Sequence, residues 1–116
     1  MFAFLFGLKN IAPAALQQRL QAVTVIDVNS VQSWQTAHVP GARHLDALTF
    51  AAADLPADHA VALVFYCSNP LCRKAPAGAR RARQMGYTDV VVMSAGIRGW
   101  VEAGLPTESS AGFAVR

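Results

Sequence analysis

Three compact, largely apolar runs constrain what this chain can fold into more than any other feature of its sequence. They occupy residues 23–28, 61–66 and 90–93, and valine recurs in each of them. Runs of this length and composition predict strands, and the lack of a regular polar alternation indicates burial on both faces of a sheet. Helical patterns separate the runs, so the sequence predicts an α/β domain with a parallel sheet.

The segments between these runs carry signals for helices, a turn and one more short strand. Helices are expected at residues 13–21, 31–36, 46–53, 76–85 and 97–103, a strand at 43–45 and a turn at 38–42. Pro13 and Pro76 suit the first position of a helix, and Ser30 and Asp46 are favourable N-caps. Because the residue before a proline is disfavoured in a helix, the loop after residue 66 is expected to extend to about Ala75.

Length and composition predict one globular domain. The chain has 116 residues, of which 53% are hydrophobic and 15% charged, which argues against disorder. We expect residues 1–116 to form a single domain, with an apolar N-terminal extension at 1–10 and a C-terminal tail at 109–116. The apolar start has no basic residue before it and is too short to span a bilayer, so we expect it to pack on the core as an edge strand or short helix. A weak membrane or dimer contact through Phe2, Phe4 and Phe6 is the alternative.

The most distinctive residue is Cys67, which directly follows the predicted strand at 61–66. Ligand sites of open α/β sheets lie at the carboxyl ends of the strands, and Cys67 is at such an end. Backbone N–H groups of the following loop and the start of the next helix would surround its sulfur with positive potential. These surroundings favour the thiolate, so Cys67 is the candidate nucleophile; the alternative is a buried structural cysteine.

Positive charge gathers close to Cys67 in the sequence. The formal net charge is only +3, but no acidic residue occurs between Asp58 and Asp89. The same interval contains these basic residues: Arg73, Lys74, Arg80, Arg81 and Arg83. This arrangement suits a small anionic substrate, although the last three residues are expected to form a solvated helix face in any case. Nucleic acid is not expected as a partner, because the stretch has no interleaved aromatic residues and no known binding motif.

Cys67 and Cys72 are the two cysteines of the chain. Two cysteines make neither a disulfide framework nor a four-ligand zinc site, so no metal or other cofactor is expected. Their use fits a reducing compartment, and the cytoplasm is the expected location.

Four sequence blocks, taken together, resemble the rhodanese-like family. They are Val25-Ile26-Asp27-Val28, His38-Val39-Pro40-Gly41-Ala42, Phe65-Tyr66-Cys67 and Gly96-Ile97-Arg98-Gly99-Trp100 continuing through 103–106. The blocks follow the order and spacing of the family from about residue 11 to 108. The resemblance implies a five-stranded parallel sheet flanked by helices on both faces. It also implies transfer of a sulfane sulfur, as from thiosulfate to cyanide or a thiol, through a persulfide on Cys67.

The chain departs from the family pattern at three places. Asn29 stands where an arginine usually follows the Asp-Val pair, and Thr36-Ala37 replaces a pattern that ends in glycine. The third departure is the loop, which the span of residues 67–86 indicates to be about two residues longer than in rhodaneses. The loop also lacks the usual central glycine and carries Pro70 and Cys72 instead. These differences bear on the substrate more than on the fold.

The loop supplies the candidate substrate-binding residues, which are Ser68, Asn69, Leu71, Cys72, Arg73 and Lys74. A guanidinium can hold two oxygens of a sulfonate and a lysine offers a point charge, so the expected partners are a small anionic sulfur donor and a thiol acceptor, either a small molecule or a protein. Cys72 is either a small residue packed under the loop or a resolving thiol that attacks the persulfide or closes a disulfide with Cys67. Asp27 is expected to accept hydrogen bonds at a strand end, and His38 to lock a turn.

Two other functions compete with sulfur transfer. Residues 67–73 also form a Cys-x5-Arg pattern, which in phosphatases and arsenate reductases wraps a tetrahedral oxyanion. Against that reading, Tyr66 stands where certain cell-cycle phosphatases usually have histidine, and no evident general acid follows. The third possibility is a non-enzymatic sulfur carrier or redox module in which Cys67 and Cys72 exchange.

Overall fold

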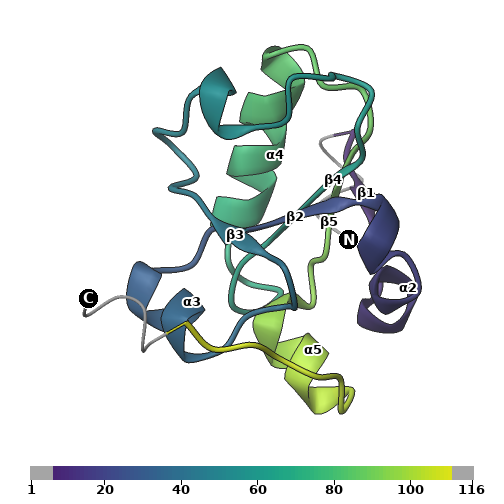
Figure 1. Cartoon of the computed structure of the whole chain (residues 1–116), viewed down its shortest axis with the longest axis vertical. Coiled ribbons are helices and arrows are strands. Elements are labelled where there is room, and N and C mark those ends of the chain that lie inside the picture. The colour runs from purple at the N-terminus through teal and green to yellow at the C-terminus, as the bar shows by residue number, and fades with distance from the viewer. Residues whose placement is uncertain (1–6, 111–116) are drawn as a thin grey trace.

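The computed structural model describes residues 7–110 of the chain. Five parallel strands form one sheet in the spatial order β1-β5-β4-β2-β3 (Figure 1). The strands are β1 (Lys9–Asn10), β2 (Thr24–Asp27), β3 (Arg43–His44), β4 (Leu63–Tyr66) and β5 (Val90–Val92). This is the sheet that the resemblance implied, and the three apolar runs form β2, β4 and β5.

Burial explains why the apolar runs lie in the middle of the sheet. β4 pairs with β2 on one side and β5 on the other, and all four of its residues are buried. Successive side chains of a strand point to opposite faces, so Phe65 enters one core cluster while Val64 and Tyr66 enter another. Both faces of the sheet therefore need covering helices.

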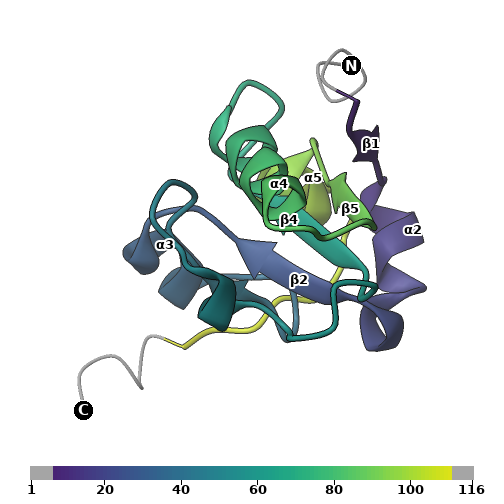
Figure 2. The same cartoon turned by 90° about the horizontal axis from the view of Figure 1, so that it is seen from above.

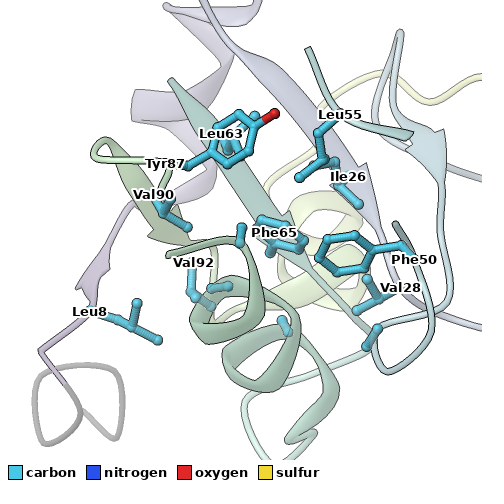
Figure 3. Close-up of a cluster of buried hydrophobic side chains, with 14 of the residues drawn as sticks. Leu8, Ile26, Val28, Phe50, Leu55, Leu63, Phe65, Tyr87, Val90 and Val92 are labelled. Carbon is cyan, nitrogen blue, oxygen red and sulfur yellow. The ribbon is translucent and has the colours of Figure 1, made fainter. Parts of the chain in front are cut away.

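Helices cover the two faces. α4 (Lys74–Gln84) packs on the face that holds Phe65, and Figure 3 shows Phe65 beside Phe50 in that cluster. α4 can pack closely there because its buried residues are small: Ala75, Gly78, Ala79 and Ala82. The opposite face is covered by α2 (Pro13–Gln17) and α5 (Gly96–Glu102), which contribute Leu16 and Trp100 to the second cluster. Figure 1 shows α5 well apart from α4, and Figure 2 shows α2 next to β1.

The helix α3 (Val31–Thr36) and the turn after it form where the sequence predicts them. Ser30 Oγ accepts a hydrogen bond from a backbone N–H of the first turn at 3.2 Å, as an N-cap does. His38 is buried, stacks on Trp34 and donates from Nδ1 to the Trp34 carbonyl oxygen at 2.6 Å. Gly41 completes the turn with a φ of 80°, which glycine adopts without steric cost. His38 therefore locks the turn onto α3, as predicted.

The prediction of a helix at residues 46–53 is wrong. The chain forms turns there, followed by a single 3₁₀ turn at Ala52–Asp54. Asp46 Oδ1 accepts a hydrogen bond from the N–H of Leu48 at 2.9 Å, and Asp54 Oδ2 accepts one from the N–H of Ala51 at 2.7 Å. Side chains that bond to nearby backbone groups in this way compete with helix formation.

Two other helix boundaries differ from the predictions. α2 ends at Gln17, and a short 3₁₀ helix at Leu20–Ala22 follows it. α4 begins at Lys74, ahead of Pro76. The N–H groups in the first turn of a helix have no partner within the helix, so proline fits its third position as well as its first. The loop after Cys67 therefore ends at Arg73, before the predicted end at about Ala75. The greater loop length relative to rhodaneses is inferred from the span of residues 67–86 and stays a prediction.

The edge strand β1 follows Leu8, which is buried. Phe2, Phe4 and Phe6 lie outside the described residues, as do residues 111–116, so the expectations for the apolar start remain predictions. Within residues 7–110, none of the helices has the length and apolar character that crossing a bilayer requires.

Candidate active site

Cys67 directly follows β4 at the carboxyl edge of the sheet. The residue is only 2% exposed and belongs to the buried cluster on the α4 face, together with Val28 and Ala75. Because β4 is held between two neighbouring strands, the backbone that leads to Cys67 is fixed in position. The chain then leaves the core as the loop of residues 68–73.

Asn69 folds this loop back on itself. Its Oδ1 accepts a hydrogen bond from the N–H of Leu71 at 2.9 Å, and its carbonyl oxygen accepts one from the N–H of Cys72 at 3.1 Å. Asparagine commonly forms such local turns. The turn brings Cys72 to Cys67, and the two sulfurs form a disulfide with Cα atoms 6.4 Å apart, within the usual range. The structure thus pairs Cys72 with Cys67, which the sequence left open.

The start of α5 holds the first residues of the loop. The N–H of Ile97 donates to the Cys67 carbonyl oxygen at 2.9 Å, and the N–H of Arg98 donates to the Ser68 carbonyl oxygen at 3.0 Å. Gly96 makes this approach possible, since a Cβ on it would lie 2.5 Å from the Ser68 carbonyl carbon. The glycine-containing block before Trp100 therefore has a positional role beside Cys67.

The loop after Cys67 also contains backbone N–H groups without an acceptor. Within residues 7–110, the N–H groups of Ser68, Asn69 and Arg73 have no hydrogen-bond acceptor. The N-terminus of α4, with its own unpaired N–H groups, follows immediately at Lys74. Oriented N–H groups and a helix N-terminus both favour negative charge nearby, so this region of the chain can stabilise an anionic sulfur.

Side-chain charge at the loop comes from Arg73 and Lys74, which are both exposed. Arg81 lies roughly 10 Å farther along α4, given a rise of about 1.5 Å per residue. Its Nε and Nη2 donate to the Phe50 carbonyl oxygen at 2.9 and 2.7 Å, and the guanidinium lies over the Phe50 ring. Arg83 donates to a backbone carbonyl near the N-terminus at 2.6 Å. The expectation of a solvated helix face is therefore wrong for Arg81, which is half-buried.

Asn29 connects the loop to the end of β2. Its Oδ1 accepts a hydrogen bond from Ser68 Oγ at 2.6 Å, and its carbonyl oxygen accepts one from His44 Nε2 at 2.7 Å. A pocket of 320 Å³ is lined by Asn29 and His44. Its polar lining comes from the ends of β2 and β3 and the start of α4: Asn29, Ser30, His44, Asp46 and Lys74. In the sequence, the signal for Asn29 is its position after a strand that ends on the same sheet edge as Cys67.

A buried network of hydrogen bonds supports the strand that carries Cys67. Tyr66 Oη donates to Asp27 Oδ2 at 2.7 Å and accepts from the N–H of Val39 at 3.1 Å, and Asp27 Oδ1 accepts from the N–H of Asn29 at 2.8 Å. Burial raises the pKa of Asp27, although the hydrogen bonds from Tyr66 and Asn29 oppose the shift. Burial and the adjacent Asp27 raise the pKa of Tyr66, which keeps its hydroxyl as a donor. Asp27 thus has the structural role predicted for it.

The structure brings most of the predicted site residues together at one edge of the sheet. These are Cys67, Ser68, Asn69, Cys72, Arg73 and Lys74. Leu71 lies on the same loop and is 86% exposed. The catalytic and binding roles of all these residues remain predictions. Within residues 7–110, no three side chains of His, Cys, Asp or Glu are placed to share a metal ion.

Comparisons with known proteins agree with this architecture. The model of the rhodanese-like domain matches residues 12–103. The chain is 34% identical over 105 residues to the HTH-type transcriptional regulator Rv0324 of Mycobacterium tuberculosis, an alignment that covers 87% of this chain and 45% of the regulator. It is 32% identical over 111 residues to the thiosulfate sulfurtransferase GlpE of Pseudomonas aeruginosa, covering 91% of this chain and 94% of the sulfurtransferase. Among solved structures, the BH2092 protein of Bacillus halodurans superposes with a TM-score of 0.80 at 19% identity, over 89% of this chain and 78% of that chain.

Proposed function

The chain belongs to the rhodanese-like domain family, and within this family we propose that it is a sulfurtransferase that carries a sulfane sulfur as a persulfide on Cys67. The observation that carries the proposal is the position of Cys67, which ends a buried strand beside unpaired loop N–H groups and the start of α4. The similarity to a thiosulfate sulfurtransferase over 94% of that protein's length supports it.

The proposed reaction starts from the reduced protein, because the disulfide leaves no thiol on Cys67. The Cys67 thiolate attacks the outer sulfur of a donor such as thiosulfate, the sulfur–sulfur bond of the donor breaks, and sulfite leaves with the electron pair. An acceptor such as cyanide or a thiol then attacks the outer sulfur of the persulfide and restores the Cys67 thiolate. This requirement for thiols suits a reducing compartment such as the cytoplasm.

The loop residues have separate roles in this proposal. The unpaired N–H groups stabilise first the thiolate and then the persulfide, which are both anions. Arg73 and Lys74 attract the anionic donor. Arg73 is exposed, so its guanidinium is accessible to a sulfonate from solution.

The test is the rate of thiocyanate formation from thiosulfate and cyanide by the reduced wild type and by the reduced Cys72→Ser variant, in which no disulfide can form within the loop. We expect turnover by Cys72→Ser and none by Cys67→Ser, because the persulfide cannot form without Cys67. Hydrolysis of an aryl phosphate, measured in parallel, examines the Cys-x5-Arg alternative. Turnover of the aryl phosphate without thiocyanate formation would refute sulfur transfer and favour the phosphatase reading.

A non-enzymatic sulfur carrier or redox module is the second candidate. It is favoured by the disulfide within the loop and by the similarity to a transcriptional regulator of which this chain spans 45%. The same assay separates the two functions by stoichiometry. An enzyme forms many thiocyanate molecules per protein, whereas a carrier loads one sulfur and does not turn over with excess acceptor.

A further inference from the structure

We infer that Cys72 resolves the Cys67 persulfide inside the loop, which releases hydrosulfide and leaves the Cys67–Cys72 disulfide found in the structure. The inference rests on the proposed function, because it requires a persulfide on Cys67. It adds a second activity to sulfur transfer. With an external dithiol as reductant, the protein releases the sulfane sulfur of its donor as hydrosulfide without a separate acceptor.

The path of the loop supplies the geometry for this reaction. The two hydrogen bonds to Asn69 turn the chain so that the Cys72 sulfur reaches the Cys67 sulfur. The bond in the structure joins Cys72 to the sulfur that belongs to Cys67, which is the inner sulfur of the persulfide. This bond is the product expected when Cys72 attacks the inner sulfur. Attack at the outer sulfur would instead move the persulfide onto Cys72.

Atoms and electrons balance in the proposed step. A bond forms between the Cys72 and Cys67 sulfurs, and the bond between the Cys67 sulfur and the outer sulfur breaks. The outer sulfur leaves with the electron pair and takes the proton of the Cys72 thiol, so the product is hydrosulfide. The Cys72 sulfur is oxidised and the outer sulfur is reduced, and no other oxidant is needed. The dithiol then reduces the protein disulfide to two thiols and becomes a disulfide itself.

The different exposure of the two cysteines determines which sulfur the external dithiol attacks when it reduces the disulfide. Cys67 is 2% exposed, whereas Cys72 is half-buried and follows the 86% exposed Leu71. An incoming thiol therefore reaches the Cys72 sulfur first. Attack there expels Cys67 as a thiolate and leaves the dithiol joined to Cys72. The second thiol of the dithiol then releases Cys72, so that reduction restores the nucleophile of the next cycle.

A single-turnover experiment without external thiol tests the inference. Reduced wild type, Cys72→Ser and Cys72→Ala each receive one equivalent of thiosulfate, and the released hydrosulfide and the mass of the Cys67 peptide are followed. We expect the wild type to release one hydrosulfide per protein and to form the disulfide. The variants should retain the sulfur on Cys67 and release it roughly 100-fold more slowly, because a neighbouring thiol acts at a far higher effective concentration than one on another molecule.

Three results would overturn the inference while the proposed function stands. They are a wild type that retains its persulfide, variants that release hydrosulfide as fast as the wild type, and a sulfur that moves onto Cys72. Failure of all three proteins to acquire a sulfur from thiosulfate would instead refute the proposed function, and the inference with it. The second variant guards against a folding defect peculiar to serine at this position.

Discussion

Replacing Gly96 with alanine should destabilise the protein and displace the loop beside Cys67. Gly96 has a φ of 69°, and an alanine in this left-handed region costs roughly 1–2 kcal/mol. The added Cβ would lie 2.5 Å from the Ser68 carbonyl carbon and 2.6 Å from the Asn69 nitrogen. Hydrogen bonds from α5 to the same segment oppose its movement, so relief of the overlap costs a further ~1–3 kcal/mol. Alanine also restricts the unfolded chain, which offsets about 0.4–1 kcal/mol of this cost, so the expected loss is roughly 1–4.5 kcal/mol and centres on about 3 kcal/mol.

Gly104→Ala is the matched control for this substitution. Gly104 has a φ of 76°, but a Cβ on it would meet no atom within 4 Å. The backbone cost and the effect on the unfolded chain are therefore the same, while the overlap is absent. We expect a loss of at most about 1.5 kcal/mol in the free energy of unfolding for this variant.

Urea unfolding of the reduced proteins measures both losses, and the rate of sulfur loading from thiosulfate measures the position of the loop. Only Gly96→Ala should load sulfur more slowly, because only its Cβ meets the backbone of the loop. Equal losses of stability in the two variants, or normal sulfur loading by Gly96→Ala, would refute the conclusion that Gly96 seats the loop against α5.

Three further predictions concern the groups that support the site. Tyr66→Phe should lower the free energy of unfolding by about 1.5–3 kcal/mol in urea, since it leaves the buried Asp27 carboxyl without its hydroxyl donor; unchanged stability would contradict this. Burial raises the pKa of Asp27 above 3.8, so the folded protein holds this proton more tightly and loses stability as the pH rises from 3.8 through the raised pKa. Asp27→Asn should remove that decline in urea unfolding across the pH range, and an unaltered pH dependence would count against it. Arg81→Ala should lower the free energy of unfolding by about 1–2 kcal/mol, because it removes the hydrogen bonds to the Phe50 carbonyl oxygen. The control Arg98→Ala removes an exposed side chain and should lower it by less than about 0.5 kcal/mol. Equal thermal stability of the two variants would contradict this difference.

The sheet could be predicted from the sequence because strands that are buried on both faces consist almost entirely of apolar residues. The central strands have few polar positions, and each was predicted to within two residues of its bounds. Cys67 could be identified as the candidate nucleophile for a related reason. The end of such a run marks the carboxyl edge of the sheet, where the chain emerges from the core.

The errors arose where one local signal permits two structures. An aspartate such as Asp46 can cap a helix or close a turn, and here its side chain accepts a hydrogen bond from the N–H of Leu48 within a turn. Pro76 can stand at the first or the third position of a helix, because neither position needs its missing N–H. Arg81 looked like a surface residue because nothing near it in sequence reveals that Phe50 lies beneath it.

The site details that stayed open depend on contacts between distant parts of the chain. Tyr66 and Asp27 are 39 residues apart, and so are Ser68 and Asn29. Their hydrogen bonds follow from the order of the strands, which local patterns do not specify. The spacing of the two cysteines permitted a disulfide without requiring it, and the turn at Asn69 brings the two sulfurs together.

Mass spectrometry of the Cys67 peptide after exposure to thiosulfate tests whether Cys67 carries the sulfur. The measurement uses the reduced Cys72→Ser protein, so that no resolving thiol removes the persulfide before it is detected. We predict the addition of one sulfur atom on Cys67, which disappears with cyanide as thiocyanate forms. An unmodified Cys67 in a folded protein that instead hydrolyses an aryl phosphate would contradict the assignment of sulfur transfer.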